Sequence, residues 1–306
     1  MTTDLAAYLR DERLPASYLA FVDTVLRPIA GRVAAIDRRG AALVVGVTGP
    51  QGSGKSAAAG ALALLLRDAG FRTAVLSIDD FYLTLSERQK LAADVHPLLI
   101  TRGVPGTHDV ALGLAVIESL GRAGATAVPR FDKARDDRRA PADWDFIAGP
   151  VDVIVFEGWC VGARPQPNTA LVEPINDLER TRDPDGAWRR YANAALAGPY
   201  QALFGQIGFQ VLLQPPSFGV VLGWRLEQEH KLRDREGPAA GQSEAEIAVF
   251  IQHYERLTRW ISTEMPARAD AVVQLGAERE VLEIVTRTAC KADPGPDHPV
   301  PRTPPS

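Results

Sequence analysis

A glycine-rich octapeptide between two apolar runs constrains the fold of this chain more than any other feature. Residues 49–56 read GPQGSGKS and match the pattern G-x-x-x-x-G-K-[ST]. The preceding run, residues 41–47, is rich in valine and has the length of a buried parallel strand, whereas residues 57–66 have high helix propensity. The octapeptide therefore joins a strand to a helix, which is the context of a phosphate-binding loop rather than of an ordinary glycine-rich turn.

The residues of this loop have the chemistry needed to bind a nucleoside triphosphate. Glycines let consecutive backbone N–H groups turn inward around an anion, and the N-terminus of the following helix adds partial positive charge. Lys55 is expected to reach the β- and γ-phosphates as a catalytic residue, and Ser56 is expected to ligate magnesium. The predicted nucleotide-binding residues are Gly49, Pro50, Gln51, Gly52, Ser53, Gly54, Lys55, Ser56 and Ala57.

Four more short apolar runs follow the loop and are separated by longer segments, several of them amphipathic. The four runs span residues 73–78, 151–156, 209–213 and 271–275. This alternation predicts an α/β fold with a doubly wound, parallel, five-stranded sheet and helices on both of its faces. Ligands of such sheets bind at the carboxyl ends of the strands, so the residues that follow each strand are the first candidates for a functional site.

The regions on either side of this pattern are expected to be extensions of a single domain. Residues 17–37 have apolar side chains at helical spacing, which predicts a helical N-terminal extension over residues 1–40. The main domain is expected to span residues 41–290. Residues 291–306 are proline-rich and nearly free of apolar side chains, which predicts a disordered tail.

Composition narrows the possible partners. The chain has 34 Lys and Arg against 38 Asp and Glu, so no overall positive field favours nucleic acid or an anionic membrane. No apolar segment approaches the roughly 20 residues that span a bilayer, and the first residues lack a signal-peptide pattern, so a cytosolic location is expected. The two cysteines and five scattered histidines suit neither a disulfide framework nor a transition-metal site. Magnesium is the metal to expect.

Acidic residues follow two of the predicted strands. Asp79 and Asp80 come directly after the second strand, in SIDDFYLT, and Glu157 follows the third, in VIVFEGWC. Asp79 can accept a proton from an attacking hydroxyl, while a helix cap or Asx turn is the alternative for either aspartate. Glu157 is predicted to bind magnesium together with Ser56, and its alternative is a solvated or capping acid.

Two polar segments are candidates for binding a phosphate acceptor. The segment PRFDKARDDRR, residues 129–139, mixes both charges, which is typical of a solvated loop but also provides arginines suited to a planar carboxylate. The segment TRGVPGTHD, residues 101–109, surrounds a Pro-Gly turn and either lines the acceptor site or caps the next helix through Asp109. The predicted acceptor-binding residues are Tyr82, Arg102, His108, Arg130, Asp132 and Lys133.

Seven segments taken together resemble a known family. In chain order, GPQGSGKS, SIDDFY, RGVPGTHD, PRFDK, FEGWCVG, INDLE and GWRLEQEHKLR resemble the D-glycerate 3-kinase family of P-loop kinases, over roughly residues 41–275. The arrangement is more distantly similar to uridine kinase, phosphoribulokinase and bacterial pantothenate kinase. In those relatives an aspartate after the second strand serves as the base, and Asp79 matches it. The resemblance thus implies a P-loop NTPase fold of the kinase type.

The resemblance also implies a moving part and an insertion. The helix predicted over residues 217–236 corresponds to a mobile lid whose Arg225 covers the phosphates and stabilises charge on the transferring group. Considered by its residues alone, that helix is charged and amphipathic, and Arg225 could equally form a surface ion pair. Residues 161–206 form an insertion longer than the uridine kinase counterpart, which argues against a nucleoside acceptor.

The function implied by the resemblance is phosphorylation of a small hydroxy acid with ATP and Mg²⁺, most simply D-glycerate to 3-phosphoglycerate. The catalytic residues would then be Lys55, Asp79 and Arg225. Two alternatives stay open: a kinase for a nucleoside, pantothenate or sugar phosphate, and an ATP-binding regulatory protein without a small acceptor. The chain lacks the N-K-x-D motif of switch GTPases. Its oligomeric state is not predicted.

Overall fold

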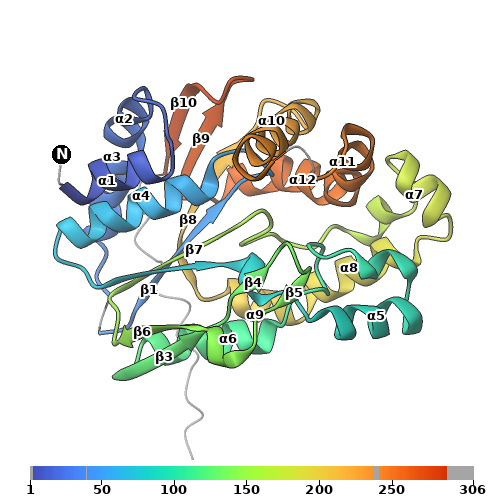
Figure 1. Ribbon diagram of the computed structural model, residues 1–306, viewed down its shortest axis with the longest axis horizontal. Helices are drawn as coiled ribbons and strands as arrows, with labels where there is room; N and C mark the ends of the chain where they lie inside the picture. Colours follow the sequence, from blue (N-terminus) through green and yellow to red (C-terminus); the bar gives the residue numbers. More distant parts are fainter. Residues whose placement is uncertain (1–2, 39, 238–240, 288–306) are drawn as a thin grey trace, which may run out of the picture.

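A six-stranded sheet lies at the centre of the computed structural model, which describes residues 3–38, 40–237 and 241–287 (Figure 1). The strand order is β10-β9-β8-β1-β7-β2. The strands are β1 (Leu43–Thr48), β2 (Thr73–Ser77), β7 (Val153–Gly158), β8 (Ile207–Gln214), β9 (Ala271–Leu275) and β10 (Val281–Thr286). Strands β1, β2, β7, β8 and β9 are parallel to one another, which confirms the five predicted strands and the α/β class.

The sixth strand was not predicted. β10 pairs antiparallel with β9 at the edge of the sheet, and its residues are half-buried or exposed, with the Leu282 side chain 62% accessible. A solvent-exposed edge strand lacks the continuous apolar run that marked the buried strands. β1 and β7, by contrast, are buried at every position.

Helices cover both faces of the sheet (Figure 1). One face packs in a single apolar cluster with α1 (Thr3–Asp11), α2 (Tyr18–Phe21), α3 (Arg27–Ala34), α4 (Lys55–Asp68) and α10 (Gly219–Glu236). The opposite face packs with α6 (Val110–Leu120), α8 (Ala187–Ala197), α9 (Pro199–Phe204) and α12 (Gln252–Glu264). A π-helical turn, η1 (Val22–Leu26), connects α2 to α3, an irregularity that the apolar spacing of residues 17–37 did not predict.

Smaller elements fill the connections. Between β2 and β7 lie η2 (Ile78–Phe81), α5 (Leu85–Asp94), η3 (Pro97–Ile100), η4 (Pro141–Asp143) and two small antiparallel pairs, β3 (Gly124–Val128) with β6 (Asp145–Gly149) and β4 (Phe131–Asp132) with β5 (Asp137–Arg138). Later connections contain η5 (Asn168–Leu171), α7 (Asp177–Arg182), α11 (Glu244–Phe250) and η6 (Met265–Ala267). The predicted tail lies outside the described residues, and within them no helix is long and apolar enough to cross a membrane.

Strand order brings the predicted functional residues to one edge of the sheet. β7 lies between β1 and β2, and in the register Glu157 is opposite Val47 on one side and Ser77 on the other. The carboxyl ends of these three strands therefore meet. Because the phosphate loop follows β1 and Asp79 comes two residues after the end of β2, both lie next to Glu157 at this edge.

Candidate active site

The phosphate loop has the backbone that its sequence predicts. β1 ends at Thr48 and α4 begins at Lys55, so the loop leads directly into a helix N-terminus with free N–H groups. Gly52 and Gly54 have φ angles of 77° and 84°, in the left-handed region that glycine adopts without strain. The Ser53 hydroxyl is buried and has no hydrogen-bond partner among the described residues. The loop thus has the shape of an anion-binding cradle.

Two elements distant in sequence support this loop. The Arg279 Nε donates a hydrogen bond of 2.6 Å to the Gly52 carbonyl, and its guanidinium pairs with Glu227 of α10 at 2.6 Å. The Trp224 indole of the same helix donates to the Ala277 carbonyl at 2.6 Å. The phosphate loop, α10 and the β9–β10 turn are therefore held together. Sequence analysis missed Arg279, because it lies in a short turn without a motif.

Substituting Gly52 with alanine tests this packing. A Cβ at Gly52 would lie 2.5 Å from the Trp224 Cβ, whereas one at Gly70, with a φ of +91°, would have no heavy atom within 4 Å. Both Gly→Ala changes incur a left-handed backbone penalty of about 1–2 kcal/mol. We expect Gly70→Ala to lower only the free energy of unfolding, and Gly52→Ala to raise the KM for ATP as well. Equal KM values in the two variants would contradict the proposed support of the loop by α10.

Glu157 and Ser56 contact each other and present oxygen atoms that could ligate a hard cation. The Ser56 hydroxyl donates to Glu157 Oε1 at 3.1 Å, while Glu157 Oε2 is buried without a partner among the described residues. Burial raises the pKa of the Glu157 carboxyl, and the nearby Lys55 opposes that change. An unpartnered buried carboxylate oxygen beside a serine hydroxyl fits Mg²⁺, which prefers oxygen ligands. The structure therefore brings together the two residues predicted for the metal.

Asp79 is bound on both carboxylate oxygens. The Tyr82 hydroxyl donates to Oδ1 at 2.6 Å, and the Lys133 ammonium donates to Oδ2 at 2.8 Å. Burial by itself would raise the pKa of Asp79, but Lys133 and Lys55 outweigh it and hold the pKa well below its usual range. Ser77 caps η2 instead, by accepting a hydrogen bond from the Asp79 amide. The Asp79 side chain is thus an ionised carboxylate in a cationic pocket, not a helix cap.

His108 lies next to Tyr82 in this pocket. The two residues form a β-bridge, and their rings are 4.7 Å apart. His108 Nδ1 lies 2.6 Å from the Tyr200 hydroxyl, and Nε2 is buried without a partner among the described residues. Burial lowers the pKa of His108 to about 4, so the imidazole is neutral at physiological pH. A neutral ring with an unused nitrogen can hydrogen-bond a ligand hydroxyl.

The other predicted acceptor residues have partners of their own. Arg102 pairs with Asp136, yet it is close enough to influence the pKa of Lys133. Arg130 lies between Asp80 and Asp145, at 2.6 and 2.7 Å. These two carboxylates neutralise Arg130.

The Asp132 carboxylate accepts hydrogen bonds from the backbone amides of Ala134 and Arg135, in the turn that follows it. Asp109 caps α6 by accepting from the Leu112 amide, as one of its two interpretations predicted. The structure therefore gathers Tyr82, His108 and Lys133 at Asp79, whereas the Arg130 and Asp132 side chains are engaged in the surrounding loops.

Arg225 is paired within its own helix. Its guanidinium contacts Glu229, whose side chain is only 3% exposed and also accepts from the Gln242 amide at 2.9 Å. The charge of Arg225 also influences the pKa of Tyr254 on α12. The Tyr254 hydroxyl donates to the Arg102 carbonyl at 2.8 Å, which links α12 to the loop over residues 101–109. Sequence analysis missed Tyr254, because a tyrosine in an amphipathic helix has the pattern of a core residue.

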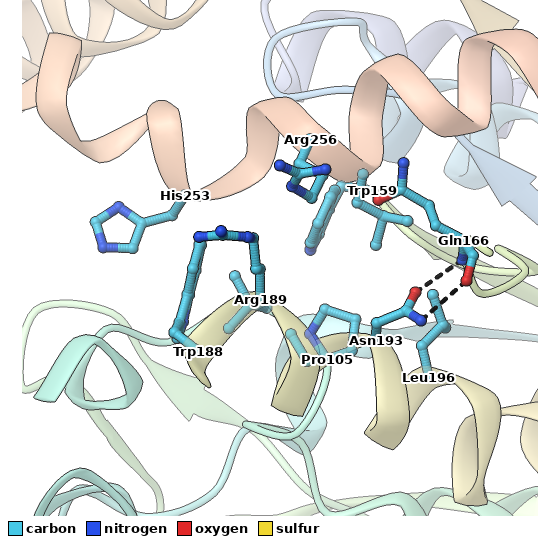
Figure 2. Close-up of a pocket in the computed structure, with 12 residues that line it drawn as sticks. Pro105, Trp159, Gln166, Trp188, Arg189, Asn193, Leu196, His253 and Arg256 are labelled. Atoms are coloured by element: carbon cyan, nitrogen blue, oxygen red, sulfur yellow. Dashed lines mark hydrogen bonds between the residues drawn. The ribbon is translucent and has the colours of Figure 1, made fainter. Parts of the chain in front are cut away.

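A small cavity lies between the loop over residues 101–109, α8 and α12 (Figure 2). Its volume of about 40 Å³ has room for only a few water molecules. Trp159 lines it and donates to the Gly103 carbonyl at 2.9 Å. Gln166 and Asn193 exchange two hydrogen bonds across its wall, as Figure 2 shows. The residues around the cavity therefore pack against the loop over residues 101–109.

The fold and site together define a class of protein. A phosphate loop after β1, a buried acid at the end of the neighbouring β7 and an ionised aspartate after β2 are the parts of a P-loop kinase. Comparisons with known proteins agree. The family model described as methylmalonyl Co-A mutase-associated GTPase MeaB matches residues 30–82, a segment that contains β1, the phosphate loop, α4 and β2.

Longer matches identify the family. The chain is 34% identical over 225 residues to the uncharacterized kinase mug58 of Schizosaccharomyces pombe, covering 70% of this chain and 79% of that one. It is 32% identical over 229 residues to the chloroplastic D-glycerate 3-kinase of Arabidopsis thaliana, covering 69% of this chain and 46% of that protein. The solved D-glycerate 3-kinase of Cryptococcus neoformans superposes with a TM-score of 0.71 at 30% identity, covering 89% of this chain and all of that one. The chain belongs to the D-glycerate 3-kinase family of P-loop kinases, and it is an ATP-dependent kinase.

Proposed function

We propose that this kinase transfers the γ-phosphoryl group of ATP to a hydroxyl of D-glycerate and produces 3-phosphoglycerate. The observation that carries the proposal is the ionised Asp79 in contact with Lys133, at the sheet edge that also holds the phosphate loop. A carboxylate can accept the proton of an attacking hydroxyl, and an ammonium beside it can bind the carboxylate of a hydroxy acid. The relatives named D-glycerate 3-kinase support this choice of acceptor.

In this proposal the loop over residues 49–57 binds the ATP phosphates, and Lys55 contacts the β- and γ-phosphates. Ser56 and Glu157 would hold Mg²⁺, and the unpartnered Glu157 Oε2 supports that assignment. When bound, the ion would neutralise negative charge on the phosphate oxygens. The protein itself would orient the triphosphate through the backbone N–H groups at the start of α4.

The phosphoryl transfer then follows from the positions of the side chains. The acceptor hydroxyl oxygen forms a bond to the γ-phosphorus, its proton passes to the Asp79 carboxylate, and the bond from the γ-phosphorus to the bridging oxygen breaks to release ADP. Tyr82 and His108 would hydrogen-bond the acceptor, with Arg102 near its charged end. Helix α10 would act as the lid, and Arg225 would leave Glu229 to contact the transferring group.

The test of this function is ADP release by the purified protein with Mg-ATP and a panel of acceptors. The panel contains D-glycerate, L-glycerate, pantothenate, uridine and ribulose 5-phosphate, and the Lys55→Ala variant is the blank. We expect stimulation by D-glycerate alone, lost in the blank. Stimulation by another acceptor would replace D-glycerate with that compound. ATP binding without stimulation by any acceptor would favour a regulatory role.

A further inference from the structure

We propose that Lys133 masks Asp79 until the carboxylate of the acceptor takes the lysine away. Masking would make the enzyme selective for acids and would suppress ATP hydrolysis when no acid is bound. This inference rests on the proposed function and adds to it a reason why the acceptor must be an anion.

The mask consists of two charge-assisted hydrogen bonds. Tyr82 occupies Oδ1 of Asp79 at 2.6 Å, and Lys133 occupies Oδ2 at 2.8 Å. A carboxylate that shares its lone pairs with an ammonium is a weak proton acceptor, because the ion pair stabilises the ionised form. In this arrangement Asp79 is positioned for catalysis but is a poor base for any hydroxyl that approaches it.

Lys133 is placed so that it can exchange partners. It lies in the turn between β4 and β5, two strands of two residues each, and its side chain is 64% exposed against 27% for Asp79. A lysine has a flexible stem and a point charge, so it can follow a new anion without a change in the backbone. The ammonium can therefore be reached from solvent while its partner stays in the pocket.

The neighbouring arginines differ from Lys133 in this respect. Arg102 pairs with Asp136, and Arg130 pairs with Asp80 and Asp145. Asp80 lies in η2, Asp136 in the turn between β4 and β5, and Asp145 at the start of β6. The Asp79 carboxylate accepts its hydrogen bonds from Tyr82 and Lys133, so it is the loss of Lys133 that exposes Oδ2.

The exchange balances charge and protons. An incoming acceptor carboxylate forms an ion pair with Lys133, and the hydrogen bond from Lys133 to Asp79 breaks. Oδ2 is then free to accept the proton of the acceptor hydroxyl as the oxygen of that hydroxyl bonds to the γ-phosphorus and ADP leaves. Water and neutral alcohols have no anion to offer to Lys133, so they meet a masked base.

The test compares the wild type with Lys133→Met in two assays. The first measures ADP release from Mg-ATP without an acceptor, and the second measures kcat/KM for D-glycerate and for glycerol, its neutral counterpart. We expect Lys133→Met to release ADP several-fold faster without an acceptor. We also expect the ratio of kcat/KM for D-glycerate over glycerol to fall about 10- to 100-fold, as for loss of a hydrogen bond between charged groups.

Two control variants and one replacement for the test variant complete the experiment. Lys133→Arg keeps the charge and should retain both the low ADP release and most of the preference for D-glycerate. Lys90→Met removes an exposed lysine from α5 and should behave as the wild type. Lys133→Gln replaces Lys133→Met in both assays if thermal melting shows that the methionine variant is unfolded.

The outcomes separate this inference from the proposed function. Acceptor-free ADP release and acid preference that both stay at wild-type values in the uncharged variants would overturn the masking. If the wild type does not phosphorylate D-glycerate, but the uncharged variants release ADP faster than it does, the masking is supported and the acceptor is wrong.

Discussion

Replacing Asp79 with asparagine is expected to lower kcat by about 10²- to 10⁴-fold, the usual contribution of a general base. Asparagine has nearly the same shape, so it can keep the hydrogen bond from Tyr82, but its amide cannot accept a proton at neutral pH. The affinity for ATP should change little, because the proposed phosphate-binding residues lie in the loop after β1. Turnover with D-glycerate and titration with a fluorescent ATP analogue measure the two effects separately.

The matched control is Asp94→Asn, which changes an exposed carboxylate at the end of α5 in the same way. It should leave both turnover and ATP affinity at wild-type values. Near-normal turnover by Asp79→Asn, with ATP binding intact, would exclude Asp79 as the base. The paired contacts of Asp79 with Tyr82 and Lys133 would then have a structural purpose only.

The parts of the fold that could be predicted are those that bury continuous apolar runs. β1, β2, β7, β8 and β9 lie between two helical layers, so their residues are apolar on both faces and are visible in the sequence. β10 is exposed, and β4 and β5 have two residues each, with a charged residue in both strands. Strands of that kind are stabilised by their tertiary surroundings and leave no pattern in the sequence.

Some residues of the candidate site could likewise be predicted from the sequence, and others could not. Residues that directly follow predicted strands, such as Asp79 and Glu157, could be assigned because strand ends converge at one edge of a parallel sheet. Partners could not be assigned, because the pairs are formed over long sequence separations: Lys133 reaches Asp79 across 54 residues, and Arg279 reaches Gly52 across 227. For the same reason the sequence made Arg130 a candidate for the acceptor, although two carboxylates neutralise it in the folded chain.

Replacing Lys55 with methionine is expected to reduce kcat/KM for ATP by at least about 10²- to 10³-fold, the effect of removing one group that stabilises charge in the transition state. Lys55 lies within the phosphate loop and is also the first residue of α4. Methionine keeps the length and the helix propensity of the side chain, so the helix should form normally. The loss would come from the charge alone.

The charge of Lys55 is expected to act on the phosphates, and it also acts on the two nearby carboxylates. Burial raises the pKa of Glu157, and Lys55 opposes it; Lys55 also helps Lys133 to keep the pKa of Asp79 low. Without Lys55, Glu157 and Asp79 would repel each other across a buried pocket, and both pKa values would rise. The variant should therefore lose ATP affinity and also require a higher pH for its residual activity.

A pH profile of kcat/KM, measured for the wild type, Lys55→Met and Lys90→Met, separates these two contributions. Lys90→Met should match the wild type throughout. A fall in activity without a shift of the acid limb would mean that Lys55 acts only on the phosphates. An unchanged KM for ATP together with unchanged kcat would contradict the assignment of residues 49–57 as the nucleotide site.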